Sequence, residues 1–250
     1  MASMMNDVLG PAPGQAASGG DADGVVSRLL TQFLFRSAVV ADNRELVPGL
    51  RLLTLEGPAL RGLHWRPGDK LQVKIGGGMT TRTYTPIEWD AAQGRTRLFA
   101  HALAPGPGGV WARDARPGQL VRLFGPRKSL DLSRLDARTG MLVGDETVIG
   151  LAAAWRPAHA LFEVNDRNAV QGVADWLGLP ATVIARQSDD GHFDRMIDAL
   201  LHAWDQDTGF VLAGRARTIQ RLLRGLRENG VTPNRILTKA YWAEGKVGLD

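Results

Sequence analysis

The sequence predicts an N-terminal antiparallel barrel of six strands over residues 25–130, followed by a C-terminal α/β domain with a parallel sheet over residues 131–250. Two observations support this fold class. Short extended runs separated by Gly- and Pro-rich turns continue to about residue 125. Beyond about residue 130, strand-like and helix-like segments alternate, which is typical of a parallel sheet covered by helices. A chain of 250 residues suits two domains that each bury a core.

The barrel prediction rests on turn signals such as PG, PGD, GGG, AQG and RPG between short strand-like runs. The expected strands lie near residues 35–41, 49–56, 69–76, 81–88, 95–103 and 119–125. Before them, apolar residues recur at helical spacing from Val25 to Phe35 and predict a short amphipathic helix. Residues 1–24 are rich in Gly, Ala, Ser, Pro and Asp, and we expect a disordered leader.

The second half repeats a strand followed by a helix. Examples are GMLVGD before TVIGLAAAW and GFVLAG before TIQRLLRGLRENG, and the strand RILTKAYW comes last. Ligands of such sheets bind at the carboxyl ends of the strands. Gly144-Asp145-Glu146-Thr147 and Gly214-Arg215 therefore fall on the expected functional edge.

Composition excludes several kinds of chemistry. The chain has no cysteine, so disulfides, thiolate nucleophiles and cysteine-ligated iron–sulfur clusters are excluded. The five histidines show no metal-ligand spacing, and we expect no resident metal. Neither a G-x-S-x-G elbow nor a complete phosphate-binding P-loop is present.

The charge balance and hydropathy bear on partners. A net charge of +4 favours anionic partners, but the arginines are spread along the chain without a basic run, so nucleic acid is not expected. No segment approaches the roughly twenty apolar residues needed to span a bilayer, and the N-terminus lacks a signal-peptide pattern. We therefore expect a cytoplasmic protein without stable membrane insertion.

The most informative motif is the run Arg82-Thr83-Tyr84-Thr85-Pro86, followed by APGPGGVWA at residues 104–112. Arg82 and Tyr84 fall on the same side of an extended segment, which puts a cation for a pyrophosphate beside a ring for a flat cofactor. Pro86 holds Thr85 extended, within reach of the edge of an isoalloxazine ring. The glycines let backbone N–H groups approach phosphate at a helix start. Together these features predict a flavin dinucleotide site.

The wider pattern resembles the siderophore-interacting protein family, a branch of the ferredoxin-reductase superfamily. The resemblance covers roughly residues 35–246 and rests on five strings in the family's order: RTYTPIEWD, LFAHALAPGPGGVWARDARPGQLVRLFGPRKS, LVGDET, LAGRA and AYWAEG. It implies an antiparallel flavin-binding barrel followed by a nucleotide-binding α/β domain. It also implies bound FAD, NAD(P)H as the electron donor and a ferric siderophore as the acceptor.

By this resemblance, Arg82 holds the pyrophosphate, Tyr84 packs on the flavin or ribityl chain, and Thr85 faces the reactive N5 edge as the candidate catalytic residue. His101 stands where the family also carries histidine, although a strand histidine hydrogen-bonded to backbone fits the position equally well. The Trp111 ring is itself expected in the core. The full set of candidate FAD contacts is Arg82, Thr83, Tyr84, Thr85, His101, Gly108, Gly109, Val110 and Trp111.

The candidate nicotinamide-nucleotide contacts are Gly144, Asp145, Thr147, Gly214, Arg215 and Arg217. Three departures from the family pattern fall in this half. The family's Gly-Glu pair is Gly214-Arg215, its GDETALP run is GDETVIG, and its Gly-Tyr-Trp is Ala240-Tyr241-Trp242. An arginine fork suits a 2′-phosphate, which favours NADPH slightly over NADH. The alternatives are an ordinary strand-to-helix turn after Gly144 and a solvated helix face for the arginines.

The expected function is an FAD-dependent NAD(P)H ferric-siderophore reductase that releases iron as Fe(II). Candidate guides for an anionic chelate are Arg127, Lys128, Lys239 and Lys246. Two alternatives stay open. One is a general NAD(P)H flavin reductase or an electron-transfer reductase for another redox protein. The other is a protein that binds flavin or siderophore without catalysis.

Overall fold

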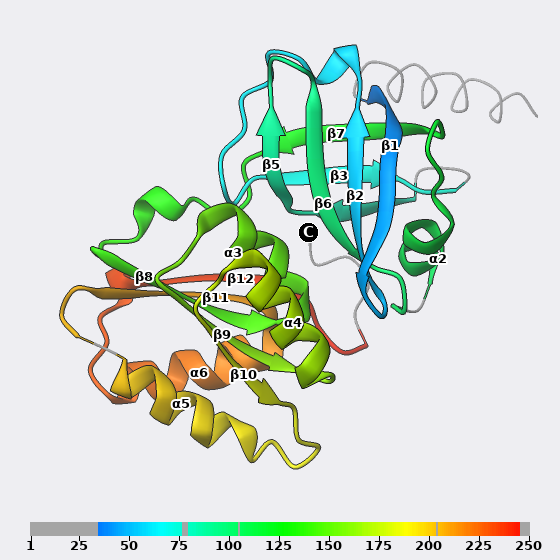
Figure 1. Cartoon of the computed structure of the whole chain (residues 1–250). Coiled ribbons are helices and arrows are strands. Elements are labelled where there is room, and N and C mark those ends of the chain that lie inside the picture. The colour runs from blue at the N-terminus through cyan, green and yellow to red at the C-terminus, as the bar shows by residue number, and fades with distance from the viewer. Residues whose placement is uncertain (1–34, 77–79, 105, 204, 246–250) are drawn as a thin grey trace, which may run out of the picture. The chain divides into compact units, whose positions relative to one another are not determined.

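A computed structural model describes residues 35–76, 80–104, 106–203 and 205–245 (Figure 1). The predicted leader and all of the predicted N-terminal helix except Phe35 lie outside the described residues. From Arg36 onward, the described chain forms one compact unit that holds a seven-stranded antiparallel sheet and a five-stranded parallel sheet.

The antiparallel sheet has the strand order β4-β3-β7-β1-β2-β6-β5. Its strands are β1 (Arg36–Val47), β2 (Leu50–Glu56), β3 (Lys70–Lys74), β4 (Thr81–Tyr84), β5 (Pro86–Asp90), β6 (Arg95–His101) and β7 (Leu120–Arg127). The expectation of six strands was wrong by one, because the predicted strand 81–88 is divided at Thr85 into β4 and β5. These are the two edge strands of the sheet, and Thr85 alone joins them. The sheet therefore curls until its edges meet, which makes it a barrel.

Side chains that alternate along the strands fill the inside of the barrel. Leu53 and Leu55 of β2 and Leu71 and Val73 of β3 have no exposed surface there. Helix α2 (Pro107–Asp114) adds Trp111 to this core. Strand β2 is apolar on both faces, because its other leucines join a second core that includes α3 and α4.

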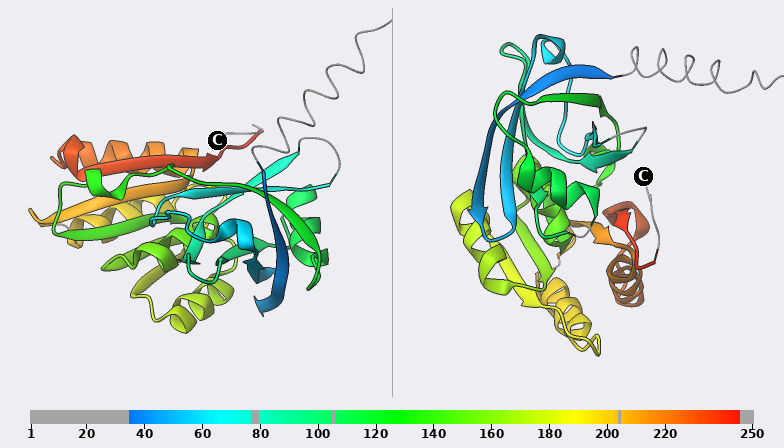
Figure 2. Two further views of the ribbon diagram at one scale, coloured as in Figure 1. Left: turned by 90° about the horizontal axis from the view of Figure 1, so that it is seen from above. Right: turned by 90° about the vertical axis from the view of Figure 1, so that its right-hand side faces the viewer.

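The parallel sheet has the strand order β10-β9-β8-β11-β12. Its strands are β8 (Thr139–Asp145), β9 (His159–Val164), β10 (Ala181–Ala185), β11 (Thr208–Arg215) and β12 (Ile236–Trp242). The helices are α3 (Ile149–Trp155), α4 (Arg167–Leu177), α5 (His192–His202) and α6 (Ala216–Glu228). Figures 1 and 2 show α3 and α4 on one face and α5 and α6 on the other. Along β8, Leu142 packs in the α3/α4 core, whereas Met141 and Val143 pack in the α5/α6 core.

The order of the parallel strands reverses between β8 and β11. From β8 the chain proceeds to β9 and β10 on one side, then returns to β11 and β12 on the other. Such a reversal opens a crevice at the carboxyl ends of the two central strands, where ligands of these sheets bind. Here those ends are Gly144-Asp145 and Gly214-Arg215, as the sequence predicts.

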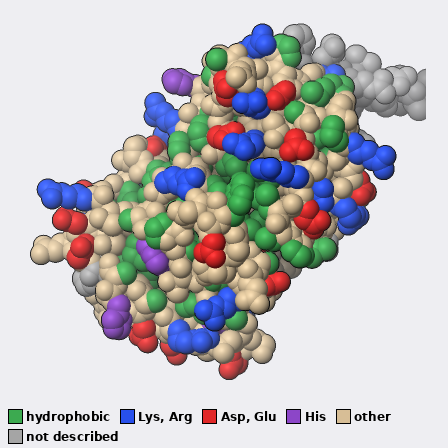
Figure 3. Space-filling model, viewed as in Figure 1, with side chains coloured by type: hydrophobic (Ala, Val, Ile, Leu, Met, Phe, Trp, Pro, Cys, Tyr) green, Lys and Arg blue, Asp and Glu red, His purple; other side chains and the backbone are tan. Residues whose placement is uncertain are grey.

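The surface carries charges of both signs. Figure 3 shows Lys and Arg side chains interspersed with Asp and Glu side chains over the face in view. Within the described part of the chain, no helix combines the length and the apolar character that crossing a membrane requires.

Candidate functional site

The first cluster of candidate residues lies on β4. Arg82 and Tyr84 stand opposite Val73 and Leu71 of β3, both fully buried in the barrel. Residues opposite each other in a ladder share a face of the sheet. Arg82 and Tyr84 therefore lie on the same side of the strand, as predicted, and Thr83 lies on the other.

The start of α2 is built around two glycines. A Cβ atom at Gly108 would lie 3.3 Å from Cγ of Arg82, so the bare backbone there leaves room for the arginine stem. A Cβ at Gly109 would lie 2.0 Å from the carbonyl oxygen of Ala104, a distance no side chain tolerates. No side chain caps the helix, and uncapped N–H groups at a helix start attract anions. A guanidinium and a helix start thus meet at one place suited to a pyrophosphate.

Tyr84 and Trp111 form the wall beside this place. Their ring centroids are 5.5 Å apart with planes tilted by 45°. Burial raises the pKa of the Tyr84 phenol, and the nearby Arg82 only partly offsets this rise, so the hydroxyl stays protonated at neutral pH. Trp111 is a buried core residue, as expected for its ring, whereas Val110 in the same turn is about half exposed.

Thr85 lies where the barrel meets the first turn of α3. Its hydroxyl oxygen is 3.5 Å from the hydroxyl of Tyr241, at the limit of a hydrogen bond. Its carbonyl oxygen would lie 3.2 Å from a Cβ placed on Gly150. Gly150 stands where the GDETALP run carries proline, and the glycine allows this close approach. Thr85 is thereby held between β12 and α3.

His101 ends β6 and faces the loop after β8. Its Nε2 lies 3.1 Å from the carbonyl oxygen of Glu146. A carbonyl only accepts, so Nε2 carries the proton and donates. His101 is thus hydrogen-bonded to backbone, which is one of the two roles expected for it from the sequence. The contact links the barrel to the loop at the crevice.

Asp145 organises the carboxyl end of β8. Its fully buried carboxylate accepts hydrogen bonds from the backbone N–H of Thr147 at 2.8 Å, from the Thr147 hydroxyl, and from Nε1 of Trp242 at 2.7 Å. A Cβ on the neighbouring Gly214 would lie 2.9 Å from Oδ2 of Asp145. Because the Thr147 hydroxyl donates to Asp145, its proton is not directed at a ligand in this arrangement.

A buried polar cluster next to Asp145 escaped prediction from the sequence. Glu163 of β9 has no exposed surface and accepts hydrogen bonds from Nε2 of His192 at 2.7 Å and from the hydroxyl of Thr218. His192 accepts a backbone N–H from Gln187 at its Nδ1, which fixes the proton on Nε2. The sequence feature that could have indicated this cluster is Glu163, an acidic residue inside the apolar run ALFEV.

Arg186 lies beside the same cluster. Its Nη2 donates to Glu146 at 3.2 Å, and its Nε is 3.9 Å from Glu163. Burial raises the pKa of the Glu146 carboxyl, and the neighbouring Asp145 adds to the rise while Arg186 and His101 oppose it.

Arg215 is buried at the end of β11, with 6% of its surface exposed. Its Nη2 donates to Glu244, its Nη1 is 4.0 Å from Glu163, and its guanidinium lies 5.9 Å from the centre of the Trp242 ring. Its Nε and Nη1 are buried without a hydrogen-bond acceptor in the described part of the chain.

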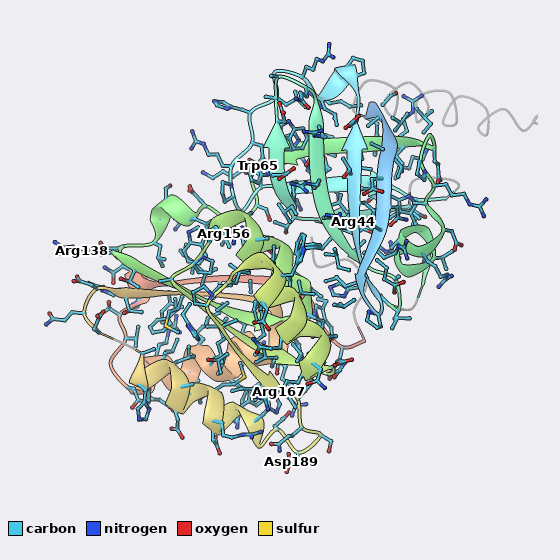
Figure 4. The ribbon with its side chains drawn as sticks, viewed as in Figure 1. Arg44, Trp65, Arg138, Arg156, Arg167 and Asp189 are labelled. Carbon is cyan, nitrogen blue, oxygen red and sulfur yellow. The ribbon has the colours of Figure 1, made fainter. Side chains whose placement is uncertain are left out.

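The next two arginines of the nucleotide half are also engaged. Arg217 is more than half exposed and pairs with Asp190. Figure 4 labels Asp189, the residue before Asp190 in the sequence. Arg221 lies 5.8 Å from the centre of the Phe193 ring.

Two of the candidate guides for a chelate are engaged by polar partners within the described residues. Arg127 donates to Gln72 at 2.6 Å. Lys128 pairs with Asp131 at 2.6 Å, and this pair, with a hydrogen bond from Ser133, holds the pKa of Asp131 at about 2. Lys239 lies on β12, and Lys246 lies outside the described residues.

Lys128 also lines a cavity of about 520 Å³ with Trp155. Trp155 packs against Gly140 near the start of β8. This cavity therefore lies at the amino ends of the parallel strands, whereas the crevice lies at their carboxyl ends.

Comparisons with known proteins agree on the fold. The family model "Siderophore-interacting FAD-binding domain" matches residues 72–130. A siderophore utilization protein from T. fusca is 23% identical, with a TM-score of 0.68, and the match covers 86% of this chain and 95% of that one. The siderophore-interacting protein SipS from Aeromonas hydrophila is 20% identical, with a TM-score of 0.69, covering 85% and 93%.

A ferredoxin NADP+ reductase from Neisseria gonorrhoeae, solved with bound FAD and NADP, is 12% identical, with a TM-score of 0.68, and the match covers 84% of this chain and 99% of that one. No curated protein sequence matches the chain. The structural matches at these identities establish the fold, and the family model identifies the barrel segment that includes Arg82, Tyr84 and the start of α2. Residues 72–130 therefore match the siderophore-interacting FAD-binding domain, and the described chain has the fold of the siderophore-interacting proteins and of the ferredoxin reductase.

Proposed function

We propose that this protein is an FAD-dependent reductase of the cytoplasm that takes electrons from NAD(P)H and reduces iron(III) held by a siderophore. The observation that carries the proposal is the meeting of Arg82 with the uncapped start of α2, next to Tyr84 and Thr85. In this arrangement Arg82 and the N–H groups of Gly108 and Gly109 bind the pyrophosphate of FAD. Tyr84 packs against the flavin, and Thr85 faces its N5 edge.

The residues present fit FAD on their own chemistry. Gly108 keeps the space beside Arg82 open, and Gly109 keeps the helix start close to the loop. Bound FAD supplies the conversion between two-electron and one-electron chemistry. One hydride from NAD(P)H reduces two ferric ions to two ferrous ions and leaves NAD(P)+ and a proton. Iron leaves as Fe(II), because an oxygen-rich chelator holds the ferric ion more tightly.

The nucleotide site of the proposal is the crevice between β8 and β11. Gly144, Asp145, Thr147 and Gly214 line the ends of these strands. Arg215 and Arg217 would favour the 2′-phosphate of NADPH, and each is paired with a carboxylate, Glu244 and Asp190. Binding of that phosphate therefore requires an exchange of partners. Arg127, Lys128, Lys239 and Lys246 are proposed to guide the anionic chelate.

The test is spectroscopic. Purified protein, with FAD added where needed, is titrated anaerobically with NADH and with NADPH, and the bleached flavin is then mixed with a ferric siderophore and a ferrous-iron indicator. We expect bleaching by at least one nucleotide and formation of Fe(II) on mixing. A protein that takes up no FAD by calorimetry overturns the proposal.

Two further outcomes separate the alternatives. Faster reoxidation by a redox protein than by the ferric chelate would indicate an electron-transfer reductase. FAD binding without bleaching by either nucleotide would indicate another electron donor or a non-catalytic role.

A further inference from the structure

The end of β12 crosses the crevice through three contacts. The Tyr241 hydroxyl is 3.5 Å from Thr85, Nε1 of Trp242 donates to Asp145 at 2.7 Å, and Glu244 accepts from Arg215. We call residues 241–244 the β12 strap. The strap thus covers the edge of the sheet at which the nucleotide is proposed to bind.

Arg215 is incompletely satisfied beneath the strap. Glu244 accepts from Nη2 only, whereas Nε and Nη1 are buried without acceptors in the described chain. The carboxylate of Glu163 is 4.0 Å from Nη1, too far for a hydrogen bond. A phosphate group offers several charged oxygens and pairs with an arginine fork through two parallel hydrogen bonds. Arg215 is therefore matched to a phosphate better than to its present partner.

The two members of the pair differ in solvent exposure. The Arg215 side chain is 8% exposed, whereas the Glu244 side chain is 62% exposed. Leaving Arg215 returns the Glu244 carboxylate to water at little cost, because most of it is already hydrated. The Arg215 guanidinium, in contrast, is buried, with Glu163 of β9 and Trp242 of the strap near it.

The charged groups around Arg215 bear on which carboxylate an incoming phosphate can replace. Two cations, Arg186 and Arg215, pair with or lie near the carboxylates of Glu146, Glu163 and Glu244. A fourth carboxylate, that of Asp145, lies close enough to Glu146 to help raise its pKa. Asp145 and Glu163 are fully buried, and Glu146 is about one quarter exposed. Glu244 is the one carboxylate of these four with a largely exposed side chain. An incoming phosphate can therefore reach Arg215 by displacing Glu244, and this removes the one anion that would otherwise stand beside the phosphate at the guanidinium.

We propose that Glu244 is an internal competitor of the nucleotide, a carboxylate that occupies Arg215 until a phosphate of the nicotinamide nucleotide replaces it. This proposal rests on the proposed nucleotide function of the crevice. Under this proposal the strap lowers the affinity of the crevice for the nucleotide, because each binding event must break the Arg215–Glu244 pair.

The experiment compares wild type, Glu244→Gln and the control Glu228→Gln. Glutamine keeps the shape of the side chain and removes its charge. Glu228 ends α6, is exposed, and has the same charge change without a contact to Arg215. Calorimetry measures the dissociation constants of NADP+, NAD+ and inorganic pyrophosphate at low and moderate salt. Thermal unfolding of each protein without ligand checks that the variants are folded.

We expect Glu244→Gln to bind NADP+ and pyrophosphate about tenfold more tightly than wild type, with a smaller gain at higher salt because screening weakens the competing pair. Glu228→Gln should match wild type. Equal or weaker binding by Glu244→Gln, in a wild type that binds nucleotide, overturns the proposal and leaves the reductase function standing. An equal gain in Glu228→Gln also overturns it, since the effect would then come from net charge.

A different pattern would refute the proposed function instead. If no protein binds either nucleotide at millimolar concentration, the nicotinamide donor is overturned. Pyrophosphate then decides the exchange separately: tighter binding by Glu244→Gln supports it, and unchanged binding refutes it as well.

Discussion

Replacing Arg82 by alanine should weaken FAD binding by about ten- to a hundredfold while leaving the barrel folded. Arg82 makes one hydrogen bond within the described structure, from Nη1 to the carbonyl of its neighbour Thr81 at 2.8 Å, so little of the fold depends on it. Its other donors make no hydrogen bond to the described residues and are therefore free for the proposed pyrophosphate. A hydrogen bond to a charged group contributes about 1.5–3 kcal/mol, and each 1.4 kcal/mol is about tenfold in affinity.

The assay is a titration of apoprotein with FAD, followed by calorimetry or by quenching of flavin fluorescence. Arg122→Ala is the matched control, because Arg122 also lies on a barrel strand and, among the described residues, makes one hydrogen bond, to Ser37 at 2.7 Å. Arg82→Lys should fall between wild type and alanine, because lysine keeps the charge and loses the fork. A change of less than twofold in Arg82→Ala, or an equal change in Arg122→Ala, would refute the assignment of Arg82 to the pyrophosphate.

Four further outcomes can be measured on the same protein. Gly109→Ala should unfold at a clearly lower denaturant concentration than Gly108→Ala. The Cβ at position 109 would lie 2.0 Å from the carbonyl oxygen of Ala104, whereas the Cβ at position 108 would lie 3.3 Å from the flexible side chain of Arg82. Equal unfolding midpoints would contradict this. Thr85→Val should slow flavin reduction in stopped flow with FAD still bound, and an unchanged rate would remove Thr85 from the N5 edge. Arg217→Glu should raise the apparent KM for NADPH about tenfold and leave that for NADH nearly unchanged, whereas equal effects would show that Arg217 does not read the 2′-phosphate. The pKa of Tyr84 is raised in the folded apoprotein, so its contribution to stability is complete below about pH 10, the ordinary pKa of tyrosine, and is lost as the pH rises further. The free energy of unfolding of wild type should therefore fall more steeply than that of Tyr84→Phe between about pH 9 and 11. Parallel curves would argue against a buried phenol.

Local pattern was sufficient for most of the fold. The alternation of strands and helices after residue 130 appears as the five parallel strands and four helices of the described chain. The break at Thr85 was missed because residues 81–88 read as one extended run, and only closure of the sheet divides them. That closure is a tertiary constraint, which periodicity does not report.

The nucleotide half shows the limits of reading motifs. Arg215 followed a strand end, as a phosphate-binding arginine would, but nothing in its neighbourhood indicated that Glu244 would cover it. Likewise, Glu163 finds its partners His192 and Thr218 at separations of 29 and 55 residues. Contacts at such separations follow from strand order rather than from local spacing. Charge pairing at the crevice was therefore beyond prediction from one sequence.

The single-residue joint between β4 and β5 has a consequence for how this barrel can vary. Loops elsewhere in a barrel can lengthen without changing its circumference, but an insertion at Thr85 would part the two edges that it fastens. Thr85, the residue proposed to face the N5 edge, thus also connects the two edge strands of the barrel. Substitutions of its side chain are open to selection for chemistry, whereas the length of the chain at this point is fixed by architecture.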